Sequence, residues 1–147
     1  MKKTIGIDPD SEKNGVALYR GSTLVELYNL SFIELQEFLL LNKGALVVIE
    51  DVMKNTATFS KKGAVTQGSI RKVAYSVGRC AQVGYHLVQF CEHHDIKYVL
   101  KPISSMWKKQ KSVFERITGY TGRSNEDTRS AAYFGFLEAQ KHGSTRK

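Results

Sequence analysis

The sequence predicts an α/β fold in which helices pack on a mixed five-stranded sheet. Three short β-rich runs follow one another within the first 30 residues, as in an antiparallel meander. An almost wholly apolar run at 45–50 is typical of a central strand that is buried on both faces. A long stretch at 70–91 repeats apolar residues at three- and four-residue steps, which indicates a helix facing a core.

The meander accounts for the first three strands. Residues 4–8 are predicted as the first strand, and Pro9 ends it because proline cannot donate a hydrogen bond to a sheet ladder. Residues 15–20 and 23–30 are predicted as the second and third strands, joined by a turn at 21–22. Connections this short join antiparallel neighbours.

A helix and a parallel strand are predicted next. Ser31 and Glu34 form the pattern of a capping box, and Leu35 and Leu39 fall on one face of the helix that follows. The apolar strand at 45–50 comes after it. A helical crossover of this kind makes two strands parallel, and we place this strand beside the first one.

The middle of the chain combines a loop and a long helix. Residues 53–68 contain three lysines together with threonine, glycine and other polar residues, so we expect an exposed, mobile, basic segment. The helix at 66–94 is predicted to face the core along six turns. Its predicted core-facing residues are Ile70, Val73, Ala74, Val77, Cys80, Ala81, Gly84, Leu87, Val88 and Cys91.

The remaining elements complete the fold class. A short strand is predicted at 98–100, then a helix from Ser104 or Ser105 to about Ile117, then a final helix at 125–141. The order βββαβαβαα is that of ribonuclease-H-like folds, with a mixed five-stranded sheet and helices on both faces. Several enzyme families share this order, so it does not give the function.

Composition narrows the class of protein. The 147 residues fit one domain, 1–147, and the contents of 41% hydrophobic and 24% charged residues exclude disordered and fibrous classes. No apolar run approaches the ~20 residues of a membrane span, and Asp8 interrupts any signal peptide. We therefore expect a cytoplasmic protein without a membrane partner. Cys80 and Cys91 are expected to be reduced, and no zinc-site spacing is present.

The charge distribution favours a polyanionic partner. Lysine and arginine outnumber aspartate and glutamate by 22 to 14, a net charge of +8. Residues 52–124 carry 13 basic and 3 acidic side chains, a net +10. Nucleic acid is the first candidate partner. A basic surface that serves only solubility is the alternative.

Two carboxylates are predicted at the ends of neighbouring strands. Asp8 ends the first strand and Glu50 ends the strand at 45–50, so both should emerge side by side. Carboxylates this close repel each other unless a cation lies between them, and oxygen ligands suit Mg²⁺ or Mn²⁺. A solvated acidic turn is the alternative for Glu50 and Asp51.

A third acidic pair, Glu126 and Asp127, opens the final helix. Favourable interaction with the helix dipole would explain it alone. However, the small residues Ala131, Ala132 and Gly135 would let this helix approach the sheet closely, with its first turn over the two strand ends. Three acidic positions at one edge are typical of two-metal phosphodiester hydrolysis.

Stretches along nearly the whole chain resemble motifs of the RuvC-like Holliday junction resolvases, in the same order. They are Ile5–Asp10 with Gly15–Ala17, Val48–Val52, Gln67–Arg79, Lys101–Pro102 with Lys108–Lys109, and Asp127–Ala132. Each motif is weak alone, and the set is specific. The amino-acid sequence of the last stretch and the short length of the chain resemble those of phage-type members.

This resemblance implies a crossover junction endodeoxyribonuclease that acts in DNA recombination and repair. Such an enzyme is a homodimer that binds branched DNA, namely four-way junctions and also forks or flaps. It nicks opposed strands and leaves 5′-phosphate and 3′-hydroxyl ends. The resemblance also implies two Mg²⁺ ions per active site, which Mn²⁺ can replace. If the chain is phage-encoded, its compartment is the cytoplasm of a bacterial host.

The family's site residues map onto four acids and two lysines. Asp8, Glu50 and Asp127 match its metal-binding carboxylates. The family usually carries two carboxylates one turn apart in the last helix, and here Glu126 is the only candidate for the second. One of Lys108 and Lys109 is predicted to stabilise charge in the transition state.

Eleven residues are predicted to contact DNA, mostly through phosphates. They are Met53, Lys54, Phe59, Lys61, Lys62, Arg71, Lys72, Arg79, Lys108, Lys109 and Lys111. Met53 or Phe59 could insert between bases, although a core position is as good an interpretation of Phe59.

The helix at 66–94 is also the predicted dimer interface. Tyr75, Val83, Tyr85 and Phe90 lie off its core-facing stripe and would leave apolar area exposed in a monomer.

Two other functions stay open at this stage. One is a related small nuclease that acts in ribosomal RNA maturation, and the other is a non-catalytic nucleic-acid-binding module on the same fold. An actin-like ATPase is excluded, because it needs two such domains around a nucleotide.

Overall fold

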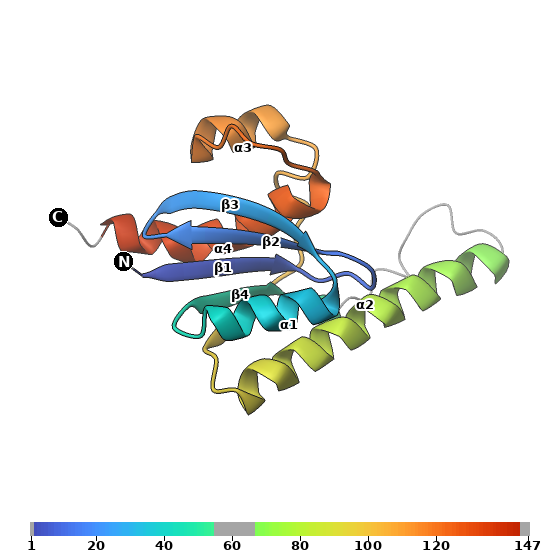
Figure 1. The fold of residues 1–147 in the computed structure, drawn as a ribbon. Coiled ribbons are helices and arrows are strands. Elements are labelled where there is room, and N and C mark those ends of the chain that lie inside the picture. Colours follow the sequence, from blue (N-terminus) through green and yellow to red (C-terminus); the bar gives the residue numbers. More distant parts are fainter. Residues whose placement is uncertain (1, 55–66, 145–147) are drawn as a thin grey trace.

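The structure is a computed structural model that describes residues 2–54 and 67–144. Its elements follow the predicted order, with a short 3-10 turn, η1 (Val52–Lys54), after the fourth strand (Figure 1). The strands are β1 (Lys3–Asp8), β2 (Asn14–Arg20), β3 (Thr23–Leu30), β4 (Leu46–Glu50) and β5 (Tyr98–Lys101). The helices are α1 (Phe32–Leu41), α2 (Gln67–His93), α3 (Lys111–Thr118) and α4 (Glu126–Ser144).

The strands form one mixed sheet in the order β3-β2-β1-β4-β5. β1 pairs with β2 antiparallel and with β4 parallel, and β5 pairs with β4 parallel. The register sets Ile7 opposite Ile49, so Asp8 and Glu50, the next residues on their strands, leave the sheet side by side. The predicted mixed five-stranded sheet is confirmed.

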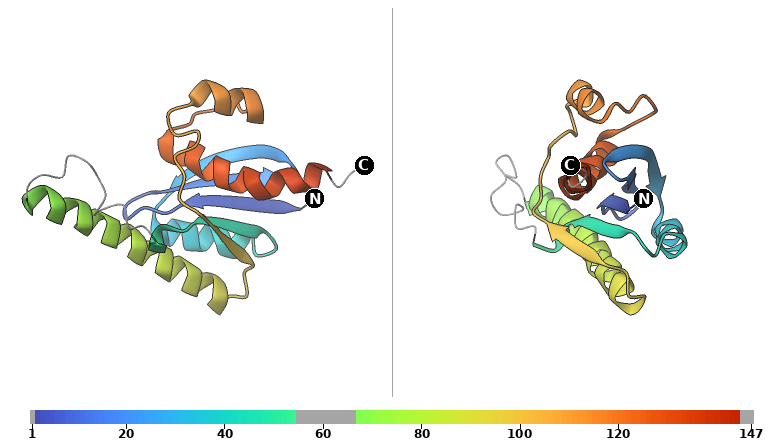
Figure 2. Two further views of the ribbon diagram at one scale, coloured as in Figure 1. Left: turned by 180° about the vertical axis from the view of Figure 1, so that it is seen from behind. Right: turned by 90° about the vertical axis from the view of Figure 1, so that its left-hand side faces the viewer.

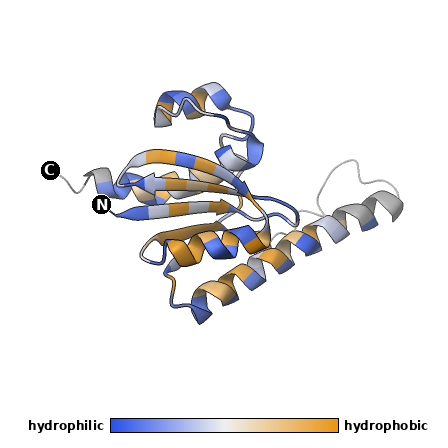
Figure 3. Ribbon diagram, in the orientation of Figure 1, coloured by the Kyte–Doolittle hydropathy of each residue, from blue (hydrophilic) through white to orange (hydrophobic). Residues whose placement is uncertain are grey.

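Helices cover both faces of the sheet, as predicted (Figure 2). On one face, α1 and α2 pack over strand residues such as Ile5, Val47 and Ile49. On the other face, α4 and the region of α3 pack over Ala17 and Tyr19. The strands and α1 carry broad apolar bands, whereas α3 is mostly hydrophilic (Figure 3). In the described residues no helix is long and apolar enough to cross a lipid bilayer.

The predicted close approach of α4 to the sheet is present. A methyl group at Gly6 of β1 would collide with the carbonyl oxygen of Ala131 and the backbone of Gly135. One at Gly15 of β2 would collide with the backbone of Asp127. The first turn of α4 therefore lies directly over the strand ends that lead to the acidic residues.

Local signals in α1 are also confirmed. The Ser31 hydroxyl accepts a hydrogen bond from the Glu34 N–H at 3.2 Å, and the Glu34 carboxylate accepts one from the Ser31 N–H at 2.8 Å. These two bonds satisfy amide groups that the first turn leaves unpaired.

The prediction for α2 is only partly correct. Leu87 and Cys91 are buried against the strand residues and Gly84 is buried against Val52 of η1, but Ala74 is exposed. The reason is length: the N-terminal part of α2 extends past the end of the sheet, where there is no core for it to cover (Figure 1). Phe90, predicted to be exposed, packs against the core.

The predicted start of α3 is wrong. The helix begins at Lys111, and neither Ser104 nor Ser105 caps it. Trp107 has a φ of 69°, in the left-handed region, which a right-handed helix cannot include. Its buried ring packs with Phe114 and Tyr133, at centroid distances of 5.7 and 5.5 Å. Burial of this ring fixes residues 104–110 as a turn-rich loop.

Candidate active site

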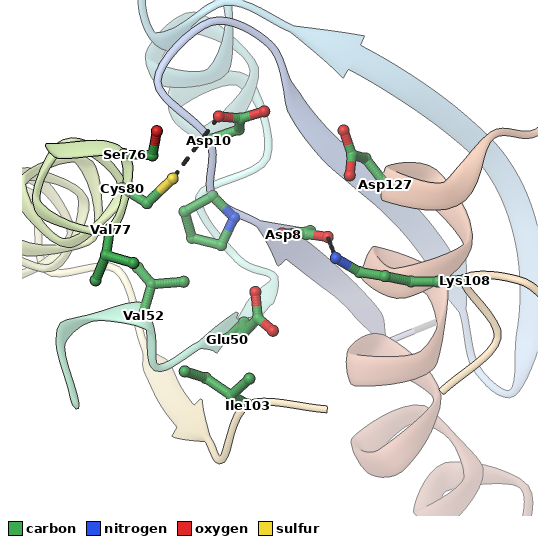
Figure 4. Close-up of a pocket in the computed structure, with 11 residues that line it drawn as sticks. Asp8, Asp10, Glu50, Val52, Ser76, Val77, Cys80, Ile103, Lys108 and Asp127 are labelled. Carbon is green, nitrogen blue, oxygen red and sulfur yellow. Dashed lines mark hydrogen bonds and ion pairs between the residues drawn. The ribbon is translucent and has the colours of Figure 1, made fainter. Parts of the chain in front are cut away.

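A cavity of about 300 Å³ opens at the carboxyl-terminal edge of the sheet, between the first turn of α4 and the middle of α2 (Figure 4). Four carboxylates and one lysine contribute to its walls. The lining residues are Asp8, Pro9, Asp10, Glu50, Val52, Ser76, Val77, Cys80, Ile103, Lys108 and Asp127. Residues far apart in the sequence thus meet at one point.

Asp8 and Glu50 form the buried floor of this cavity, and each is only 5% exposed. Desolvation is the main reason that the pKa of Asp8 is raised. Desolvation, followed by the charge of Asp8, raises the pKa of Glu50 to about 8. The parallel register of β1 and β4 holds the two groups together, although the charge of Asp8 disfavours ionisation of Glu50.

Lys108 supplies the positive charge beside this pair. Its Nζ lies 3.7 Å from Oδ2 of Asp8, with the lysine side chain 32% exposed. Burial alone would lower the pKa of Lys108, but the charges of Asp8, Glu50 and Asp127 outweigh it, and the pKa is raised. The ammonium group is therefore held charged by the acidic cavity. Lys109, the other candidate, is exposed and does not line this cavity.

The two acids of α4, Glu126 and Asp127, line different cavities. Asn125 caps the first turn, because its side chain accepts a hydrogen bond from the Thr128 N–H at 2.8 Å. Asp127 is half-buried and lines the cavity with Asp8 and Glu50. Glu126 is exposed and lines a neighbouring cavity with Lys109. Burial raises the pKa of Asp127, although Lys108 opposes the shift.

The donor atoms suit a hard cation. Oδ2 of Asp8 is buried and accepts no hydrogen bond, within the described part of the chain. Desolvation is the main cause of the raised pKa values of Asp8 and Glu50, and a cation bound between them would favour their ionised forms. However, no group of three His, Cys, Asp or Glu side chains in residues 2–54 and 67–144 is spaced to hold a metal ion. The described residues thus bring carboxylate oxygens together at this edge of the sheet without completing a metal site.

Sequence reasoning missed several cavity residues. Asp10 is not among the predicted site residues, but it lines the cavity. Its Oδ1 accepts a hydrogen bond from the Ser11 N–H at 2.6 Å and lies 3.8 Å from the Cys80 sulfur. Cys80 was assigned to the core, and Ser130, whose hydroxyl lies beside Asp8, was not considered. The sequence signal for Asp10 is its place two residues after Asp8, in the same turn.

The predicted DNA-contacting residues are widely distributed. Arg71, Arg79, Lys109 and Lys111 are exposed. Arg79 lies over the ring of Tyr75 at 5.5 Å. Met53 is half-buried beside Gly84 of α2. Phe59, Lys61 and Lys62 lie outside the described residues, and so do the side chains of Lys54 and Lys72.

Comparison with known proteins shows the fold. No family model matches the sequence, and no curated protein matches it. Among solved structures, the chain is similar to T. thermophilus RuvC in complex with a Holliday junction substrate, with a TM-score of 0.62 and 10% identity over 99% of this chain and 96% of that one. It is also similar to a second Thermus thermophilus RuvC structure, with a TM-score of 0.56 and 12% identity over 97% and 95%. The ribonuclease-H-like fold is therefore confirmed, with structural similarity to RuvC.

Proposed function

We propose that this chain is a metal-dependent endonuclease that nicks four-way DNA junctions. One observation carries the proposal: Asp8 and Glu50 are buried side by side, facing Lys108 and Asp127, at the edge of a sheet whose fold matches RuvC along nearly the whole chain. Buried acids with raised pKa values in a cavity are typical of functional sites.

Asp8 and Glu50 would hold the first divalent cation, and Asp127 is the third candidate ligand. Mg²⁺ is the expected ion, with Mn²⁺ as a substitute, because every candidate ligand is a carboxylate oxygen. A bound cation of this kind supplies an activated water and neutralises charge on a phosphate. Two ions per site, with Glu126 as a further ligand, follow from the family resemblance and stay a prediction.

Lys108 has a different role in each state of the site. In the metal-free protein its ammonium group neutralises part of the charge on Asp8. Cations held by the carboxylates would leave this ammonium group available to the phosphate oxygens of the substrate. A preorganised positive charge at that position stabilises the additional negative charge of the transition state.

The reaction is phosphodiester hydrolysis. The oxygen of water bonds to phosphorus while the bond from phosphorus to the 3′ oxygen breaks. One proton from that water ends on the 3′ oxygen, which gives 5′-phosphate and 3′-hydroxyl ends.

Branched DNA is the proposed substrate, and a homodimer is the proposed assembly. The solved T. thermophilus protein is bound to a Holliday junction, and the basic excess of residues 52–124 suits a phosphate-rich partner. Paired nicks need two active sites related by two-fold symmetry. The phage-type assignment stays a prediction from the amino-acid sequence of residues 127–132.

A cleavage panel tests the proposal. Four-way, three-way, flap and duplex DNA, and structured RNA, are incubated with Mg²⁺ or Mn²⁺. We expect nicking of four-way junctions that Asp8→Asn and Glu50→Gln each abolish while junction binding is kept. Glu12→Gln, a change at an exposed acid outside the cavity, is the matched control and should leave nicking unchanged.

Three results would contradict the proposal. Near-normal turnover by Asp8→Asn or Glu50→Gln would show that the metal site is wrongly assigned. Preferential cleavage of RNA would favour the nuclease of ribosomal RNA maturation. Tight junction binding without any cleavage by the wild-type protein would favour the non-catalytic module.

A further inference from the structure

Arg129 is a buried arginine whose described partners are not carboxylates. It lies in α4, is only 8% exposed, and does not line the acidic cavity. Its Nε donates to the carbonyl of Trp107 at 3.0 Å, and its Nη2 donates to the carbonyl of Lys108 at 2.6 Å. Its Nη1 donates to the Ser124 hydroxyl at 3.0 Å. No ion pair between Arg129 and an acid is present in the described part of the chain.

A gain in stability does not explain these contacts. Moving a guanidinium group out of water without an ionic partner carries a large desolvation penalty. A well-packed apolar side chain at position 129 would avoid this penalty. The arrangement therefore favours a role in geometry, because a guanidinium group can hold several acceptors in fixed directions at once.

The acceptors belong to a loop that has little regular structure of its own. Residues 104–110 contain the left-handed Trp107. Hydrogen bonds within the loop join the Met106 N–H to the Ser104 hydroxyl, the Trp107 N–H to the Gln110 side chain, the Lys108 N–H to the Ser105 carbonyl and the Gln110 N–H to the Trp107 carbonyl. The contact of Arg129 with the Trp107 carbonyl is buried, and its contact with the Lys108 carbonyl is part-buried. Arg129 donates to both carbonyl groups and so ties the loop to α4.

Lys108 is the residue that links this tie to the acidic cavity. Arg129 holds its backbone carbonyl, and its side chain carries the ammonium group that lies 3.7 Å from Asp8 (Figure 4). A lysine side chain has several rotatable bonds, so its ammonium group is placed only if its backbone is fixed. The same helix, α4, supplies both Arg129 and Asp127, which keeps the loop and the acids in register.

We propose that Arg129 is a positioning residue, which fixes the 107–108 backbone so that the Lys108 ammonium group stands over Asp8 in the cavity. Its effect on cleavage rests on the nuclease function proposed above. Its effect on the position of Lys108 does not, because that contact is present in the metal-free protein.

The first test measures the position of Lys108 without any activity. The metal-free protein is treated with an amine-modifying reagent, and modification is followed for each lysine by peptide mass mapping, with exposed Lys111 as the internal reference. Arg129→Gln should modify Lys108 several-fold faster than wild type, and Arg129→Lys should give an intermediate rate. Tyr19→Phe is the matched control, because it removes a buried hydrogen bond to α4, from Tyr19 to the Ala132 carbonyl at 2.6 Å, without touching the loop.

The second test asks whether Arg129 acts through Lys108. Lys108→Ala should lower kcat by about 100-fold, the usual loss when one charge-stabilising donor is removed. Arg129→Gln should lower kcat by at least about tenfold in the wild-type background and should have no further effect in the Lys108→Ala background. If Arg129→Gln does not fold, Ser124→Ala, which removes one contact of the guanidinium group, should give a smaller change in the same direction.

The outcomes separate this proposal from the nuclease function. Unchanged Lys108 modification in Arg129→Gln, or equal modification in Tyr19→Phe, would overturn the positioning role. Equal losses of kcat in the wild-type and Lys108→Ala backgrounds would also overturn it. If the wild-type protein cleaves nothing, but Lys108 is modified faster in Arg129→Gln than in wild type, only the nuclease function is contradicted.

Discussion

Glu50 shows at the scale of one residue how a functional site opposes folding. Its carboxyl group is buried beside Asp8, and Lys108 offers one positive charge for the two acids. The register of β1 and β4 leaves neither acid free to move into solvent. A pair of apolar residues would fit the same strand ends at lower cost, so the two acids are explained by the chemistry of the cavity.

The metal-free protein should lose stability through Glu50 as the pH rises. The pKa of this group is about 8 in the folded chain, against an ordinary value of 4.5. Between these values the folded state keeps a proton that the unfolded state releases, so the free energy of unfolding falls as the pH rises. From about pH 5 to about pH 8, Glu50→Gln should gain on the order of 2 kcal/mol relative to wild type. Urea unfolding in the presence of a chelator measures this difference.

The control for this measurement is Glu37→Gln, at an exposed glutamate of α1. It should follow the pH dependence of the wild type. Parallel curves for wild type and Glu50→Gln would show that Glu50 titrates in its ordinary range and that the pair is not strained. Added Mg²⁺ should stabilise the wild type more at about pH 8 than at about pH 5, because the ion binds ionised carboxylates.

The contact of α4 with β1 and β2 sets the geometry of the site at the scale of elements. Gly6 and Gly135 let two backbones meet where any side chain would intervene. Asp127 can reach the strand ends only because of this approach. Small residues here serve the position of the acidic helix as well as the packing of the core.

Gly6→Ala should separate α4 from the sheet. The added methyl group meets backbone atoms of Ala131 and Gly135, which cannot rotate away as a side chain would. We expect a loss of stability of about 2–4 kcal/mol, as for other overpacked or strained core positions, with a decrease in nicking. Chemical denaturation and junction cleavage measure the two effects.

Gly78→Ala is the control for this change. Gly78 lies in α2, and nothing stands within 4 Å of an added methyl group. An alanine in a helix is favoured over glycine, so this variant should be more stable by about 0.5–1 kcal/mol. A Gly6→Ala protein with wild-type stability would show that α4 can shift without cost.

Most elements could be predicted because their signals are local. The capping box of α1, the alternation of strands and turns, and the apolar β4 depend on residues that are neighbours in the sequence. The start of α3 could not be predicted, because the backbone of Trp107 is decided by a ring that packs against distant residues. The exposed part of α2 could not either, since periodicity does not reveal where a sheet ends.

The candidate site, like the fold, could be predicted only where neighbouring residues in the sequence determine it. Asp8 and Glu50 were predictable because strand ends and parallel pairing place them together. The choice of Lys108 over Lys109 was not, because it depends on a loop that is held by Arg129. The role of Arg129 requires the tertiary contact between α4 and residues 107–108.

At the scale of the whole molecule, charge sets the expected behaviour toward DNA. The net charge is +8, and the acidic cavity is flanked by exposed basic residues such as Lys109. Contacts with phosphates release condensed counterions, so junction affinity should fall at least about tenfold between about 50 and 200 mM salt. Fluorescence anisotropy with a labelled junction measures this dependence.

Single substitutions locate the contacts. Lys109→Gln and Lys111→Gln should each reduce the salt dependence by about one unit of slope. Lys2→Gln, at the opposite end of β1, should not change it. Affinity that does not depend on salt would remove the proposed role of the basic residues.

Assembly is predicted through α2. Its N-terminal part projects beyond the sheet, and Tyr75 and Tyr85 are 68% and 50% exposed. Val83 lies half-buried between these positions in sequence. We expect a homodimer, and a charge in Val83→Asp should weaken it and uncouple the two nicks before single-strand cleavage suffers.

Light scattering at micromolar concentration tests the dimer. Ser22→Asp, in the turn between β2 and β3, introduces the same charge at another exposed position and should leave the mass unchanged. A monomeric wild type that still makes paired nicks would contradict the prediction.

The antiparallel arrangement of α4 and β1 has a practical consequence for handling the protein. β1 begins and α4 ends at the edge of the sheet opposite Asp8 and Asp127 (Figure 1). A dye, an affinity tag or a surface tether attached at either terminus would therefore stand clear of incoming nucleic acid. Immobilised molecules should be suitable for observing single binding events in real time.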